Sequence, residues 1–75
     1  MIRYLCKASD MKRALKKHTV EQRDLLQGKK VIGVQFRCGD GGIVNVYHST
    51  RVLLQGMDGP SRKLAEAACE AVEVE

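Results

Sequence analysis

A glycine-rich segment between two alternating apolar runs constrains the fold of this 75-residue chain more than any other feature. Residues 30–38 alternate apolar with polar or small side chains, which is typical of a strand with one buried face. Residues 43–47 alternate in the same way. The connecting Gly39-Asp40-Gly41-Gly42 offers several positions that tolerate positive φ, as a tight turn requires. The chain is therefore expected to have an antiparallel hairpin at its centre.

The pattern continues beyond this hairpin. Ser49-Thr50 is typical of a turn, and residues 51–55 are typical of a third strand. Pro60 suits the first turn of a helix, with Asp58 or Ser61 as its cap, and apolar spacing extends that helix to Val72.

The first 28 residues are interpreted as mainly helical. Ser9 is a good N-cap for a helix that runs to His18. Residues 19–22, Thr-Val-Glu-Gln, have the form of a capping box, so we expect one or two more helical turns ending at Gly28. The pattern leaves open whether this is one bent helix or two, and whether residues 1–6 are a strand or a lead-in.

Together these elements predict an α+β fold with one small domain over residues 1–75. We expect one or two helices, a three-stranded antiparallel sheet and a C-terminal helix, with the helices packed on one face of the sheet. A chain of this length has no room for a large enzyme scaffold with a deep cleft. It contains no apolar run near the ~20 residues that cross a bilayer and no signal peptide, so we expect a cytoplasmic protein.

Cysteine and histidine spacing argues against a metal site. Cys6, Cys38 and Cys69 are odd in number and about thirty residues apart, and His18 and His48 are isolated from each other. Zinc sites use paired ligands two to five residues apart. We expect three reduced, buried thiols, no metal and no cofactor.

Positive charge is concentrated in the first half of the chain. Residues 1–37 carry ten Lys and Arg against three Asp and Glu, whereas residues 38–75 carry three against six. A basic region of this kind attracts polyanions, because each neutralised phosphate releases counterions. Lys12 and Lys16 lie on the outer side of the expected first helix, where they could bind such a polyanion. The alternative is that this side of the helix is simply solvated and has no partner.

Two surfaces are candidates for binding. Strand alternation places a mixed set on the sheet face opposite the helices: Gln35, Arg37, Asn45, Tyr47, Arg51, Leu53 and Gln55. Amides and guanidinium groups hydrogen-bond base edges or phosphates, and a tyrosine ring stacks on a base. The second surface is the start of the last helix, where Arg62 and Lys63 would meet an anion, unless they pair with Glu66 and Glu70.

The strand residues also resemble a known family. The segments 34–37 (VQFR), 44–49 (VNVYHS) and 52–56 (VLLQG), with a glycine-rich turn after the first, resemble the N-terminal, TATA-binding-protein-like domain of ribonuclease HIII. The resemblance implies a small domain that contacts nucleic acid through its sheet, at Gln35, Asn45, Tyr47, Leu53 and Gln55. His48-Ser49-Thr50-Arg51 lacks the Gly-Lys pair typical of the family. The catalytic ribonuclease domain lies outside the resemblance, so no nuclease activity is implied.

A second resemblance ranks below the first. The element order and residues 62–66 (RKLAE) are similar to a double-stranded-RNA-binding domain, whose last helix opens with Lys-Lys-x-Ala-Lys. Glu66 departs from that motif, and the chain lacks the longer first loop that enters a minor groove.

The sequence therefore predicts a non-enzymatic nucleic-acid-binding module. No nucleophile has a base and an orienting group at suitable spacing, and the turn glycines lack the Lys-Ser/Thr of a phosphate loop. DNA, RNA and a hybrid remain open. The alternative is a protein–protein adaptor or inhibitor, in phages or mobile elements for example, that blocks a nucleic-acid enzyme or a defence protein. Both a monomer and a homodimer paired through sheet edges remain open.

Overall fold

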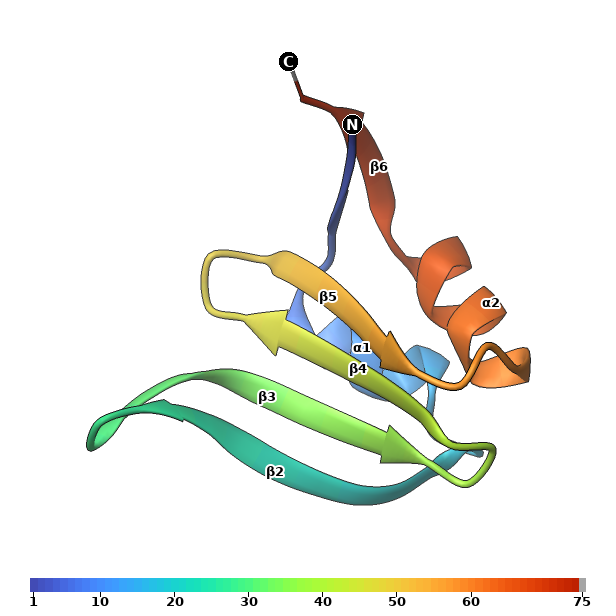
Figure 1. The fold of residues 1–75 in the computed structure, drawn as a ribbon, viewed down its shortest axis with the longest axis horizontal. Helices are drawn as coiled ribbons and strands as arrows, with labels where there is room; N and C mark the ends of the chain where they lie inside the picture. Colours follow the sequence, from blue (N-terminus) through green and yellow to red (C-terminus); the bar gives the residue numbers. More distant parts are fainter. Residues whose placement is uncertain (75) are drawn as a thin grey trace.

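A computed structural model describes residues 1–74 as one antiparallel sheet of six strands with two helices (Figure 1). In chain order the elements are β1 (Ile2–Leu5), α1 (Ala8–Ala14), β2 (Thr19–Gln27), β3 (Lys30–Cys38), β4 (Gly42–Tyr47), β5 (Arg51–Gly56), α2 (Pro60–Ala68) and β6 (Glu70–Glu73). The strand order across the sheet is β2-β3-β4-β5-β1-β6. Neither helix is long and apolar enough to cross a membrane.

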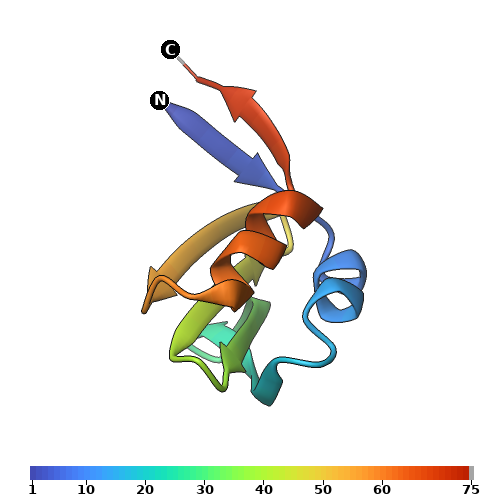
Figure 2. The ribbon, with the colours of Figure 1, turned by 90° about the vertical axis from the view of Figure 1, so that its right-hand side faces the viewer.

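Both helices pack against the same side of the sheet (Figure 2). Strand register aligns Phe36 with Val44 and Val46 with Val52, so these side chains share one face. They form the core together with Met11 of α1, Leu15 directly after α1, and Ala65 of α2. The apolar alternation of β3, β4 and β5 therefore buries one face, as its period of two requires.

The expected α+β class, the central hairpin and the strand after it are confirmed. Gly41 has φ +89° in the turn between β3 and β4. The first helix begins one residue before Ser9, after Lys7, without a side-chain cap. The last begins at Pro60 as expected, but its N-cap is Gly59.

The prediction of a second helical segment over residues 19–28 is wrong. Residues 19–27 form β2, which pairs with β3 along nearly its whole length. Gly28, expected to end a helix, has φ +63° and opens a two-residue hairpin turn to Lys30. The capping-box pattern is a local signal, and pairing with a neighbouring strand outweighs it because it satisfies the backbone groups of the whole segment.

The sheet has six strands instead of three, because β2 and the segments 2–5 and 70–73 also join it. The last helix ends at Ala68 rather than Val72, since Cys69 is already extended with φ −89° and ψ 154°. The chain then forms β6, which pairs with β1 from Ile2↔Glu73 to Leu5↔Glu70. These two strands make an arm that carries both termini and projects away from the other four strands (Figure 1). Only Tyr4↔Val52 and Leu5↔Arg51 pair the arm with β5.

Candidate functional site

The face of the sheet opposite the helices is the first candidate site. Strand register aligns its side chains in rows across the strands. One row is Arg23, Gln35, Asn45 and Leu53, and the next is Glu21, Arg37, Ile43 and Gln55. A third row aligns Leu25, Gly33 and Tyr47. We call these three rows, together with Arg51, which lies two residues before Leu53 on the same face of β5, the open face, because no element within residues 1–74 packs over them.

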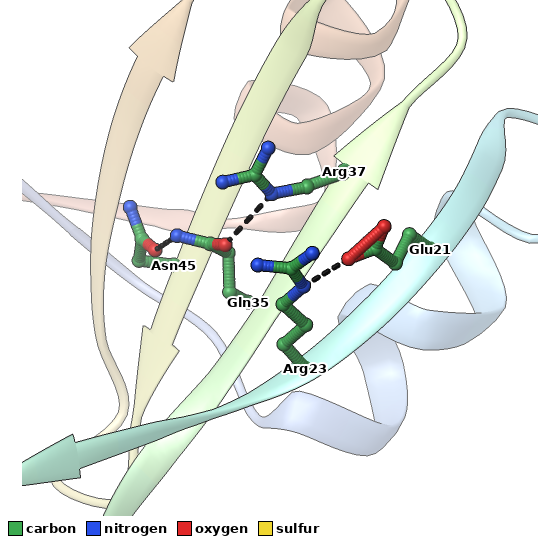
Figure 3. Close-up of polar contacts among 5 residues, drawn as sticks. All are labelled: Glu21, Arg23, Gln35, Arg37 and Asn45. Carbon is green, nitrogen blue, oxygen red and sulfur yellow. Dashed lines mark hydrogen bonds and ion pairs between the residues drawn. The ribbon is translucent and has the colours of Figure 1, made fainter.

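A chain of hydrogen bonds orders the centre of the open face (Figure 3). Arg37 Nε donates to Gln35 Oε1 at 3.1 Å, and Gln35 Nε2 donates to Asn45 Oδ1 at 3.0 Å. The amide nitrogen of Asn45 then donates to Gln55 Oε1 at 2.8 Å and to the Leu53 carbonyl at 3.3 Å. The chain thus joins side chains of β3, β4 and β5 in fixed orientations.

Asn45 differs from the other residues predicted on this face because it is only 2% exposed. Its amide oxygen and nitrogen are both engaged by neighbouring groups. A buried amide with satisfied hydrogen bonds orients its neighbours rather than contacting a ligand. Asn45 is therefore a positioning residue for Gln35 and Gln55.

Arginine side chains add positive charge to the open face. Arg37 and Arg51 are exposed, and Arg23 projects from β2 toward Gln35 and Arg37 in Figure 3. Arg23 Nε is paired with Glu21 of the same strand. An exposed pair of this kind contributes little to stability, so it leaves the guanidinium accessible.

A hollow of about 470 Å³ lies at one end of the open face, beside the β2–β3 and β4–β5 turns. Tyr47, Leu53 and Val31 supply its apolar lining. Lys30, Arg51 and His48 supply its polar and cationic lining. An aromatic ring with apolar neighbours and cations around it suits a flat ligand that carries negative charge.

A second hollow, of about 270 Å³, lies between β1 and β5, where the arm diverges from the sheet. Arg3, Arg51 and Arg62 all line it. Of the two residues predicted at the start of the last helix, Arg62 thus reaches the opening beside the open face, whereas Lys63 is exposed on α2.

The N-terminus of α2 already holds an anion from within the protein. Asp40, in the β3–β4 turn, accepts hydrogen bonds from the Ser61 backbone N–H at 2.8 Å and the Ser61 hydroxyl at 2.7 Å. It also accepts from the Gly42 N–H at 3.0 Å. These donors lower the pKa of Asp40 to about 2. Arg62 Nε pairs with Glu66 Oε1 at 3.4 Å. The sequence offered this pairing within the helix as the alternative to contact with an anion.

Lys12 and Lys16 lie on the opposite side of the molecule from the open face. Both are exposed, on α1 and just after it, and Lys16 lines a hollow there with Arg13, Lys17 and Leu64. The positive charge of residues 1–37 is therefore divided between two sides of the fold. Lys12 and Lys16 do not join the same surface as Arg37 and Arg51.

Arg23 was missed as a neighbour of the site, because residues 19–28 were expected to be helical. Lys30 was placed in the expected strand 30–38 but was not named as a site residue. Two signals could have located the strand that contains Arg23 and its turn to Lys30. Thr19 and Val20 are β-branched residues that favour strands, and Gly28-Lys29 fits a two-residue hairpin turn with glycine first.

Within residues 1–74, no three or more His, Cys, Asp or Glu side chains are arranged to hold a metal ion. Burial raises the pKa of the Cys38 thiol, which disfavours the reactive thiolate.

Comparison of the chain with protein families, curated proteins and solved structures finds no match. The resemblances to the ribonuclease HIII accessory domain and to the double-stranded-RNA-binding domain therefore stay hypotheses.

Proposed function

We propose that the protein is a non-enzymatic nucleic-acid-binding module and that the open face is its contact surface. The observation that carries the proposal is the hydrogen-bonded chain from Arg37 through Gln35 and Asn45 to Gln55 on a sheet face without a covering element in residues 1–74. Ordered amides beside guanidinium groups suit a ligand with both base edges and phosphates. The resemblance to the ribonuclease HIII accessory domain points to the same surface.

The residues of the open face and of the larger hollow divide into three roles. Arg23, Arg37 and Arg51, with Lys30 in the lining of the hollow, are suited to phosphates. The amides of Gln35 and Gln55 are suited to base edges. Tyr47, in the wall of the larger hollow, is suited to stacking on one base. With a single aromatic ring, the affinity comes mainly from charge, and binding weakens steeply as salt is raised.

A titration of labelled single- and double-stranded oligonucleotides at several salt concentrations tests this function. We expect the double variant Arg23→Ala with Arg37→Ala to bind at least about tenfold more weakly at low salt and to lower the slope of log affinity against log salt by about 1.5. The matched control is Lys12→Ala with Lys16→Ala, which removes the same charge from the opposite side. We expect that control to keep the slope of the wild type.

Tyr47→Ala separates stacking from charge. We expect it to weaken binding by about tenfold without changing the salt slope, because stacking neutralises no phosphate. Two results would overturn the proposal: no binding at low salt, or equal losses in the open-face and control variants.

A protein partner is the second candidate, and the β2 edge favours it. Strand β2 pairs on one side only, and its Val20 and Leu26 are 73% and 60% exposed. An edge strand with apolar side chains can pair with a strand of another chain. A stoichiometric partner retained from nuclease-treated lysate by the wild type, and lost in the variant Val20→Lys, would favour this function. Light scattering would show whether the partner is a second copy.

A further inference from the structure

Cys6 and Cys69 each lie one residue beyond the end of the β1–β6 ladder, where the arm meets the body of the protein. The β1–β6 ladder ends at Leu5↔Glu70, so the next pair in the same register is Cys6 and Cys69. Directly opposite residues of an antiparallel ladder have Cα atoms about 4.5–5.5 Å apart. A disulfide needs a Cα separation of about 4.4–6.8 Å. The backbone register is therefore suitable for a cross-strand bond.

The two side chains also point the same way. Cys6 is part of the buried core, and Cys69 packs against that core. The thiols are close enough that each affects the pKa of the other. Cys38 is different, because it lies at the end of β3, where Ser61 and Thr19 are its neighbours.

A small reagent can reach this pair. Cys6 lines a surface hollow of about 310 Å³ together with Lys7, Asp10, Thr50 and Glu70. The Cys69 side chain is half-buried rather than buried. Cysteines that a dissolved reagent can reach are open to oxidation, whereas cysteines enclosed in a core are inert.

We propose that Cys6 and Cys69 are a disulfide site that fastens the β1–β6 arm to the body of the protein when a low-molecular-weight disulfide is present. One cysteine attacks that reagent as a thiolate and forms a mixed disulfide, which releases the first small thiol. The second cysteine attacks the bound protein sulfur and releases the second small thiol. The protein loses two electrons and two protons, and the reagent gains them as two thiols.

The bond would fix the most weakly attached part of the sheet. The arm joins β5 through only two residue pairs, and its two strands are paired with each other as far as the bond from Val74 N–H to the Met1 carbonyl. A bond from Cys6 to Cys69 closes a loop that contains most of the sequence, and long loops give large stabilisation in the chain-entropy account. We expect the oxidised protein to melt more than about 10 °C above the reduced one.

The reaction is expected to be slow at neutral pH. Burial, the neighbouring Cys6 and Glu66 raise the pKa of Cys69 to about 12. Burial and Asp10 also raise the pKa of Cys6. Because only the thiolate attacks, the rate should rise roughly tenfold for each pH unit in the alkaline direction. High-pKa thiols are also poor leaving groups, so the bond should be reduced slowly once formed.

The test uses oxidised glutathione at about pH 8.5, followed by alkylation in denaturant and digestion with trypsin. Cleavage after Arg3, Lys7 and Lys63 separates the two cysteines into peptides 4–7 and 64–75. We expect these two peptides to be joined, Cys38 to be alkylated, and the intact mass to fall by about 2 Da before alkylation. The matched variants are Cys38→Ala, which should still form the bond, and Cys69→Ser, which should stop at a glutathione adduct.

Peptide mapping of the wild-type protein shows whether the bond forms even if a cysteine variant fails to fold. Any product other than the joined peptides, including unreacted thiols, would overturn the proposal. A joined product whose melting temperature is unchanged or lower would overturn it as well. Oligonucleotide binding is measured separately, so its failure leaves this result intact.

Discussion

The two faces of the sheet are held by different interactions. In β4 alone, Val44 and Val46 are 1% exposed under the helices, and Asn45 between them is 2% exposed on the open face. The valines are buried by apolar contacts with the core. Asn45 lies between side chains of β3 and β5 and is hydrogen-bonded to both strands.

This difference separates stability from specificity. Burial of apolar surface is non-directional and supplies most of the folding free energy. A hydrogen-bonded chain adds only a small net stabilisation, but it holds each side chain in one orientation. The face under the helices, which carries Phe36, Val44 and Val46 and which we call the covered face, therefore keeps the sheet folded. The open face presents a defined polar pattern to solvent.

The largest expected effect is the loss of the main core side chain. Phe36 is 1% exposed, so Phe36→Ala should lower the free energy of unfolding by about 3–5 kcal/mol. The matched control on the open face is Leu53→Ala, at a residue that is 41% exposed, with an expected loss of under about 1 kcal/mol. Urea unfolding monitored by circular dichroism measures both. Similar losses in the two variants would contradict the assignment of the core to the covered face.

The second effect tests the order of the open face. Asn45→Ala should cost about 1–3 kcal/mol, because it removes the partners of Gln35, Gln55 and the Leu53 carbonyl in a buried position. Gln55→Ala is the control at an exposed residue of the same chain, with a loss under about 1 kcal/mol. The Asn45→Ala variant should also bind oligonucleotides more weakly, since Gln35 is no longer oriented. A stable variant with unchanged binding would show that the chain of hydrogen bonds has no role in positioning.

The covered face was more predictable from the sequence than the open face. Alternation in residues 30–38 and 43–47 shows directly which side chains face the helices, because the period of a strand is two. Asn45 was placed on the correct face, but its burial depends on amides of two other strands. Single-strand patterns contain no information about such contacts.

The outer strands were the least predictable part. Residues 19–27 have both a capping-box pattern and β-branched residues, and pairing with β3 decides between them. Residues 70–73 continue the helical spacing of α2 and yet pair with β1. In both cases a contact between segments distant in sequence outweighs local propensity. Arg23 was missed as a site neighbour for the same reason.

A smaller effect is expected at the turn that supports the covered face. The pKa of Asp40 is lowered from 3.8 to about 2 in the folded protein, so folding favours its ionised form. Its contribution is present above about pH 4 and is lost as the pH falls toward about 2. Asp40→Asn should lower the melting temperature by about 5 °C at neutral pH and by much less near pH 2.

Thermal melts of both proteins over this pH range make the measurement. Oligonucleotide affinity at neutral pH serves as the control, because Asp40 supports α2 rather than the open face. A difference in melting temperature that stays constant down to pH 2 would show that the carboxylate charge is not what stabilises the turn.

The smallest effect concerns the two turns at the end of the sheet that borders the larger hollow. Thr50 has φ +71° in the β4–β5 turn, whereas the β2–β3 turn has Gly28 at φ +63°. A β-branched residue is strained in this region, and glycine is not. The backbone hydrogen bonds from Thr50 N–H to the Tyr47 carbonyl and from Cys6 N–H to the Thr50 carbonyl do not need the threonine side chain.

Thr50→Gly should therefore raise the free energy of unfolding by about 0.5 kcal/mol, since the relief of strain exceeds the added flexibility of the unfolded chain. Gly28→Ala should lower it by about 1 kcal/mol, although a methyl group there meets no atom within 4 Å. Urea unfolding of the two variants measures effects of opposite sign. Effects of the same sign would show that backbone conformation does not decide the stability of these turns.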